Sequence, residues 1–187
     1  MSIDSPGVAL SRLTPARREL LKDLADELLA GARHGRLLIA VDGPTDAGTT
    51  DAGTTVFADE LALALRDDGA TVFRASMDDF LLPRARRLDD RPEHHYDHRL
   101  FRRVLVDPFL MAGSTGFVLA GFDRERDVPF ESDWQTAPAD AIVLVDGALA
   151  SGSERGIWYA SIRLGSKSGD GSTITIDDSD PDAPRRI

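Results

Sequence analysis

The feature that most constrains this 187-residue chain is an unbroken apolar run that leads directly into a loop of glycine, threonine and aspartate. Residues 37–41, LLIAV, contain no polar side chain, which indicates a strand buried on both faces, as in a parallel sheet. After the loop, residues 56–65, VFADELALAL, have apolar side chains at helical spacing. A strand, a glycine loop and a helix in this order predict a site where backbone N–H groups at a helix N-terminus bind phosphate.

The loop fits the phosphate-binding spacing G-x-x-x-x-G-K-[ST] in two overlapping frames, 43–50 and 48–55, within a duplicated DAGTT. In both frames a threonine stands where the lysine is expected. The second frame adjoins the expected helix and is the better candidate for its first turn. The expected phosphate-binding residues are Gly43, Gly48, Asp51, Ala52, Gly53, Thr54 and Thr55. The hydroxyl of Thr55 is also a candidate magnesium ligand. The alternative is a glycine- and threonine-rich turn with no ligand.

Two further strands are expected to end at the same edge of the sheet. Residues 70–75 lead into Asp78, and the apolar residues 141–145 lead into Asp146. Because functional groups gather at the carboxyl ends of parallel strands, both carboxylates are expected near the loop. The structural alternatives are a helix cap or turn for Asp78 and a turn residue for Asp146.

The remaining pattern predicts several local elements. We expect a helix over 14–31, a helix over 97–106 that the Asp-Pro pair 107–108 stops, and a strand over 117–122. Two strand candidates, 157–164 and 172–176, are separated by only seven residues. A parallel crossover needs about a dozen or more, so a hairpin or an edge excursion is expected there.

Composition narrows the classes of function. The formal charge of −10 argues against a nucleic-acid partner and against an anionic membrane surface. The lack of cysteine excludes disulfides, thiolate catalysis and cysteine-based zinc sites. No apolar run approaches the about 20 residues of a membrane span, and the N-terminus lacks the pattern of a signal peptide, so a cytoplasmic location is expected. The histidines at 94, 95 and 98 could form a metal cluster, but a substrate loop or plain surface is the preferred interpretation.

Five segments in a fixed order resemble the uridine kinase-like nucleoside kinases of bacteria. They are LLIAVDGP (37–44), DAGTTVFADELALAL (51–65), VFRASMDDF (72–80), YDHRLFRRVLVDPF (96–109) and APADAIVLVDG (137–147). The resemblance runs over 36–147 and returns weakly over 157–164 and 174–184. It implies one P-loop NTPase-like domain: a three-layer α/β/α fold with a mainly parallel sheet, shortened near the C-terminus. It also implies ATP and Mg2+ as cofactors and transfer of the γ-phosphate to a nucleoside hydroxyl.

The resemblance also implies roles for single residues. Asp78 matches the carboxylate that accepts the proton of the substrate hydroxyl, and Asp146 matches an acidic residue near magnesium. The residues expected to contact the base and sugar are Phe80, Tyr96, Asp97 and His98. The expected partners are therefore a small-molecule nucleotide and a nucleoside, with a homodimer left open.

Two departures from the family pattern divide the functional hypotheses. The lysine of the loop is absent, and the interval 165–171 is too short for the helix and arginine-bearing lid that the family carries there. One hypothesis is therefore a kinase of weak or lost activity. The other is a non-catalytic domain that binds a nucleotide, a nucleoside or a protein.

Overall fold

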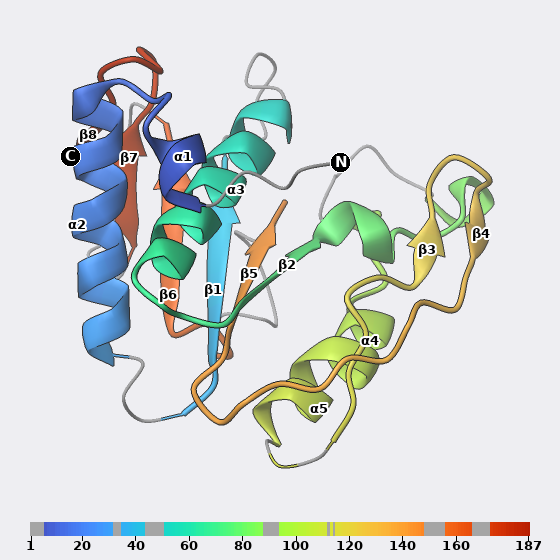
Figure 1. Ribbon diagram of the computed structural model, residues 1–187. Coiled ribbons are helices and arrows are strands. Elements are labelled where there is room, and N and C mark those ends of the chain that lie inside the picture. The colour runs from blue at the N-terminus through green and yellow to red at the C-terminus, as the bar shows by residue number, and fades with distance from the viewer. Residues whose placement is uncertain are drawn as a thin grey trace.

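The computed structural model in Figure 1 describes residues 6–31, 35–43, 51–87, 94–111, 113, 115–147, 156–165 and 173–187. Its centre is a six-stranded sheet in which every neighbouring pair of strands is parallel except the last. In spatial order the strands are β2 (Val72–Ser76), β5 (Ile142–Asp146), β1 (Leu37–Asp42), β6 (Ala160–Leu164), β7 (Ile174–Asp177) and β8 (Arg185–Arg186). The expected α/β class with a mainly parallel sheet is confirmed.

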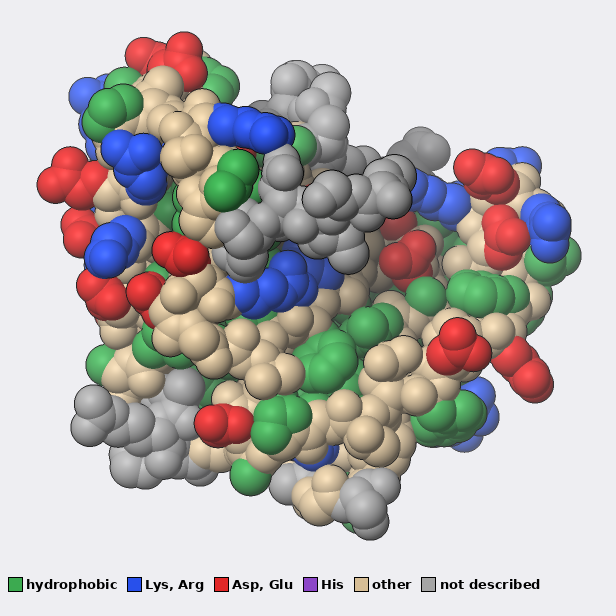
Figure 2. All heavy atoms as spheres, viewed as in Figure 1, with side chains coloured by type: hydrophobic (Ala, Val, Ile, Leu, Met, Phe, Trp, Pro, Cys, Tyr) green, Lys and Arg blue, Asp and Glu red, His purple; other side chains and the backbone are tan. Residues whose placement is uncertain are grey.

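The helical elements are α1 (Pro6–Leu10), α2 (Pro15–Gly31), α3 (Asp51–Asp67), α4 (His98–Phe101) and α5 (Asp107–Leu110). Between these helices the described residues also form the short 3-10 turns η2 (Met77–Phe80) and η3 (Arg84–Arg86) and the π-helical turn η5 (Arg102–Val106). None of the described helices is both long and apolar enough to cross a bilayer. On the face shown in Figure 2, acidic and basic side chains are interspersed over α2.

Alternation along β1 divides the core into two clusters, one on each face of the sheet. Leu37, Ile39 and Val41 belong to the cluster that α2 and α3 cover. Leu38 and Ala40 belong to the other cluster, which η5 and the helices beside it cover. The apolar run is unbroken because helices bury both faces of this strand (Figure 1).

The helix expected over 97–106 does not end at the Asp-Pro pair. It widens into the π-turn η5, where the N–H of Asp107 reaches the carbonyl of Arg102, and continues as α5 to Leu110. A proline inside an α-helix clashes with the carbonyl four residues earlier. The wider π-turn shifts the carbonyl groups relative to the residues that follow, which avoids this clash. Pro108 then lies in the first turn of α5, where its missing N–H is not needed.

The expected hairpin or edge excursion after β6 is wrong, because β6 and β7 pair in parallel. Their register joins Ile162 to Ile174 and Leu164 to Ile176, an overlap of three residues. The chain must therefore return by only about two residue steps, roughly 7 Å along the strand, before β7 begins. The dozen-residue requirement holds for crossovers that span full strands, and this overlap is much shorter.

The region 117–135 extends from the second face of the sheet as two short antiparallel ladders. Phe117 forms a bridge with Gln135, and β3 (Phe122–Asp123) pairs with β4 (Val128–Pro129) as a hairpin. The expected strand over 117–122 is thus confined to its two ends. The hairpin contacts η2 through the Gly121 N–H, which donates to the carbonyl of Asp79.

Candidate functional site

The sheet register sets the site at one edge. Asp146 at the end of β5 lies opposite Val41 of β1 and Ser76 of β2, so these three neighbouring strands end at one level. Helix α3 starts beside this edge, and η2 follows β2 directly. The predicted meeting of the loop, Asp78 and Asp146 at the carboxyl ends of the strands therefore has a structural basis.

The predicted phosphate-binding residues divide between the end of β1 and the start of α3. Gly43 follows β1 directly, and Gly53, Thr54 and Thr55 lie in the first two turns of α3. Thr54, at the position expected for lysine, is buried with 5% exposure. A β-carbon on Gly43 would lie 2.7 Å from the Thr54 hydroxyl oxygen, so these two residues are closely packed.

The other predicted loop residues are described only in part. Gly48 lies outside the described residues. Asp51 and Ala52 form the first backbone positions of α3.

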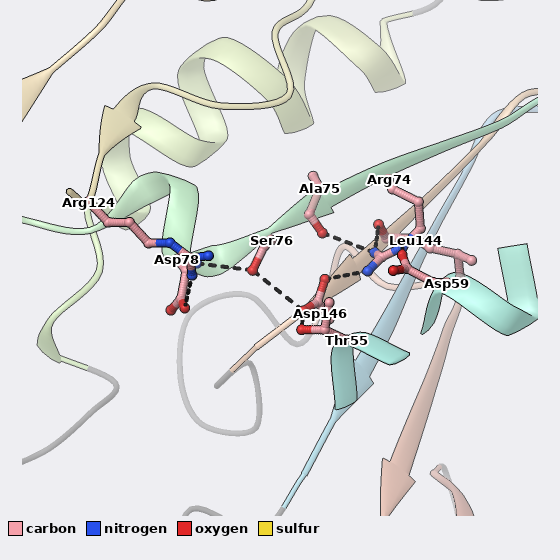
Figure 3. A network of polar contacts seen from close by, with 9 residues as sticks. All are labelled: Thr55, Asp59, Arg74, Ala75, Ser76, Asp78, Arg124, Leu144 and Asp146. Carbon is pink, nitrogen blue, oxygen red and sulfur yellow. Dashed lines mark hydrogen bonds and ion pairs between the residues drawn. The ribbon is translucent and has the colours of Figure 1, made fainter. Parts of the chain in front are cut away.

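The two predicted magnesium ligands meet in the structure. The Thr55 hydroxyl donates a 2.6 Å hydrogen bond to Oδ2 of Asp146, whose side chain is 3% exposed (Figure 3). A hydroxyl and a carboxylate are hard oxygen donors of the kind that Mg2+ prefers. The pair therefore fits a divalent cation, and the turn-residue alternative for Asp146 leaves this hydrogen bond unexplained.

Arg74 is a member of the site that the sequence analysis missed. From β2 its Nη2 contacts Oδ1 of Asp146 at 2.6 Å, and its Nε contacts Oδ1 of Asp59 on α3 at 2.8 Å. Its Nη1 donates to the carbonyls of Ala75 and Leu144 (Figure 3). The sequence shows an arginine within the expected strand 70–75, but it does not show which carboxylates that arginine meets.

Asp78 lies in η2 and faces the β3–β4 hairpin. Ser76 caps η2 by accepting the Asp78 N–H, so Asp78 is not the cap residue. Its Oδ2 contacts Nη1 of Arg124 at 3.0 Å. The Asp78 side chain is 25% exposed and that of Arg124 is 63% exposed. A carboxylate at this position can accept a proton from a bound hydroxyl, and Arg124 lies on the solvent side of it.

Asp79 is a second carboxylate next to Asp78. Burial raises the pKa of the Asp79 carboxyl, Arg124 opposes the rise, and the negative charges of Asp78 and Asp146 add to it. The same residue is tied to the hairpin through its backbone carbonyl. The site thus contains several carboxylates whose charges interact.

The predicted substrate-binding residues lie beside η2, but their environments differ. Phe80 is completely buried and packs edge-on against Phe101, with ring centroids 5.2 Å apart. Asp97 accepts the Leu100 N–H at 2.8 Å and caps α4. Tyr96 and His98 are half-buried, and their rings lie 6.2 Å apart.

A backbone hydrogen bond from the Asp97 N–H to the Phe80 carbonyl joins the two substrate-binding segments. Phe80 therefore offers no exposed ring to a base, whereas Tyr96 and His98 are accessible in part. No group of three or more histidine and acidic side chains suited to a metal was found in the part of the chain that the structure describes.

A second missed arginine lies at the end of β6. Nη2 of Arg163 is 3.6 Å from Oδ2 of Asp42, the last residue of β1, and the Arg163 side chain is 41% exposed. Asp42 is buried, and its Oδ1 accepts the N–H of Gly43. Arg163 thus brings a partly exposed cation to the strand end from which the glycine loop starts.

Comparison with known proteins identifies the fold. No protein-family model and no curated protein matches the chain. Among solved structures, a possible uridine kinase from Bacillus stearothermophilus matches with a TM-score of 0.64 and 23% identity, over 80% of this chain and 82% of the other. A candidate fructose transport system kinase from a Silicibacter species matches with a TM-score of 0.59 and 23% identity, over 79% and 75%. The chain therefore has the fold of these two solved structures.

Proposed function

We propose that this chain is a P-loop phosphotransferase of the uridine kinase-like type, which uses ATP and Mg2+ and phosphorylates a hydroxyl of a nucleoside or a similar small molecule. The observation that carries the proposal is the 2.6 Å hydrogen bond between Thr55 and Asp146. It joins the first turns of α3 to the end of β5, at the strand edge where Asp78 also lies. The two solved structures described above both carry a kinase name, one for a possible uridine kinase and one for a fructose transport system kinase.

In this proposal the backbone from Gly43 to Thr55 holds the nucleotide phosphates. Thr55 would bind the magnesium ion, and Asp146, which accepts the Thr55 hydroxyl hydrogen, would lie next to that ion. Bound there, Mg2+ would neutralise charge on the phosphate oxygens. Asp78 accepts the proton of the attacking hydroxyl, because its carboxylate is partly exposed and adjoins the phosphate-binding edge. Arg124, 3.0 Å from Asp78, helps to place that hydroxyl.

The activity is expected to be weak. Thr54 replaces the lysine that would neutralise phosphate charge, and loss of one preorganised donor typically lowers the rate by about 100- to 1000-fold. Arg163 and Arg124 bring cations to the same edge but belong to β6 and the hairpin, so neither replaces a lysine fixed in the first turn of α3.

A non-catalytic nucleotide- or nucleoside-binding domain is the second candidate function. The burial of Thr54 against Gly43 favours it, because this packing occupies the space from which a loop side chain would extend to a phosphate. The protein-interaction variant of this candidate has no comparable support in the described residues. We therefore keep ligand binding as the property that both candidates share.

Calorimetry with MgATP, followed by a phosphoryl-transfer assay over a set of nucleosides, tests the proposal. The Thr55→Glu variant is expected to abolish MgATP binding, because its carboxylate would repel phosphate beside Asp146. The matched variant Asp78→Asn is expected to keep binding and lose transfer, since it changes only the proposed base. Binding by the wild type without transfer to any hydroxyl would favour the non-catalytic domain. No binding of MgATP at millimolar concentration would exclude the kinase and the nucleotide-binding form of the second candidate, and would leave only nucleoside binding to be tested.

A further inference from the structure

Arg74 connects three parts of the molecule beneath the proposed cation site. It extends from β2, contacts Asp59 on α3, and contacts Asp146 on β5, while two backbone carbonyls hold the same guanidinium (Figure 3). The Arg74 side chain is only 16% exposed. A planar guanidinium fixed by four acceptors has little freedom to rotate, and it therefore fixes the carboxylate that it binds.

The contacts of Asp146 assign a separate role to each of its oxygens. Oδ1 accepts from Arg74 at 2.6 Å, and Oδ2 accepts from Thr55 at 2.6 Å, with the Ser76 hydroxyl 3.5 Å away. An ionised carboxylate can only accept hydrogen bonds, so the hydroxyl hydrogen of Thr55 must point to Asp146. The lone pairs of the Thr55 oxygen are then directed away from Asp146 and remain available to a cation.

We infer that Arg74 is a positioning residue for the cation site: it fixes Asp146 as the acceptor of the Thr55 hydroxyl and keeps Asp146 from binding the cation directly. The inference rests on the proposed function, since it concerns the same cation, and it adds a residue to which neither the sequence pattern nor the fold assigns a role. The positive charge of the guanidinium also keeps the metal ion from Asp146, because one fixed cation next to this carboxylate repels another.

Removal of this guanidinium therefore has a specific consequence. Asp146 is almost completely buried, and without Arg74 its charge would lack its closest cation. A divalent ion would then become the partner of Asp146. In the absence of nucleotide, Arg74→Met is expected to bind Mn2+ about tenfold more tightly than the wild type. The reason is that the substitution removes the repulsion between the positive charge of the guanidinium and that of the metal ion. Its thermal midpoint should be lower without metal and should recover more on adding Mn2+.

The experiment is a titration of the nucleotide-free chain with Mn2+, followed by the EPR signal of the free ion, with thermal unfolding in parallel. Arg74→Gln, which keeps a hydrogen-bond donor, takes the place of the methionine variant if that protein does not fold. Arg74→Lys keeps the charge and should restore most of the wild-type affinity. The double variant Arg74→Met with Asp146→Asn should lose the gain, which locates it at this carboxylate.

Arg17→Met is the matched control, because Arg17 is also a buried arginine that ties α3 to another element through two carboxylates, but it contacts Glu60 and Asp178 rather than the site. It should lower the thermal midpoint and leave the Mn2+ affinity unchanged. Equal Mn2+ affinity of Arg74→Met and the wild type, including no binding by either, overturns the inference, as does weaker binding by the variant. MgATP binding by the wild type is measured separately, so a failure of the proposed function is distinguishable from a failure of this one.

Discussion

Gly43 and Thr54 meet so closely that no side chain fits between them: a β-carbon on Gly43 would lie 2.7 Å from the Thr54 hydroxyl oxygen and 4.0 Å from its β-carbon. The end of β1 and the start of α3 are thus packed through one hydroxyl group. This contact fixes how closely the end of β1 and the start of α3 approach each other at the proposed phosphate site.

The contact predicts a non-additive pair of substitutions. Gly43→Ala should destabilise the chain by about 1–3 kcal/mol, because the new methyl group overpacks a closed contact. In a Thr54→Ala background the same substitution should cost much less, since the nearest remaining atom of residue 54 is 4.0 Å away. Urea unfolding of the four proteins measures the coupling. Equal costs of Gly43→Ala in both backgrounds would show that this packing is absent.

The buried carboxyl of Asp79 predicts that the stability of the wild type and that of the Asp79→Asn variant depend differently on pH. Burial is the main reason that the pKa of this carboxyl is raised, so the folded state holds the proton more tightly than the unfolded state. The stability that Asp79 contributes is complete below its unfolded pKa of about 4 and is lost as the pH rises through the folded pKa. Asp79→Asn removes this loss. The stability of the variant relative to wild type should therefore increase from pH 4 to pH 7 in urea unfolding, and a constant difference would contradict the pKa shift.

The sequence predicts the strand–loop–helix core because each of its signals is local. Leu37–Val41 is unbroken, Asp146 ends an apolar run, and both features follow from burial on two faces of a parallel sheet. The sequence was also sufficient to predict that Thr55 lies close to Asp146, since parallel strands bring their carboxyl ends together.

The contacts of the arginines in the site and the parallel pairing of β6 with β7 could not be predicted from the sequence, because neither feature has a local signal. Arg74 and Arg124 act through residues distant in sequence, and nothing in the sequence marks which of many arginines will meet a carboxylate. The register of β6 and β7 depends on how much of each strand pairs, which the seven residues between the two predicted strands do not specify.

Arg17 predicts a large effect on stability far from the cation site. Its side chain is 7% exposed, contacts Glu60 and Asp178 at 2.6 Å each, and joins α2, α3 and the residues after β7. Arg17→Met leaves two carboxylates without their closest cation and should cost about 3–5 kcal/mol. The exposed pair Arg186–Glu27, at 2.5 Å, is the control, because its loss in Arg186→Met should cost at most about 1 kcal/mol. Urea unfolding ranks the two, and similar costs would mean that burial does not set the strength of these pairs.

Thr54→Lys tests whether the missing lysine is what limits the proposed activity. The substitution creates the sequence G-K-T at the start of α3, directly before the proposed magnesium ligand Thr55. A cation there should tighten MgATP binding by about tenfold or more and raise phosphoryl transfer by about 100-fold, the effect typical of one preorganised donor. The variant should also be less stable, because Thr54 is buried against Gly43 and the longer side chain must leave that contact.

Thr54→Met is the control, since it has a similar length and no charge. Tighter MgATP binding by the lysine variant alone would show that the rest of the phosphate site is intact. Equal binding by both variants would instead show that the packing of Gly43 and Thr54 has closed the site, and the non-catalytic candidate would then be the better description of this chain.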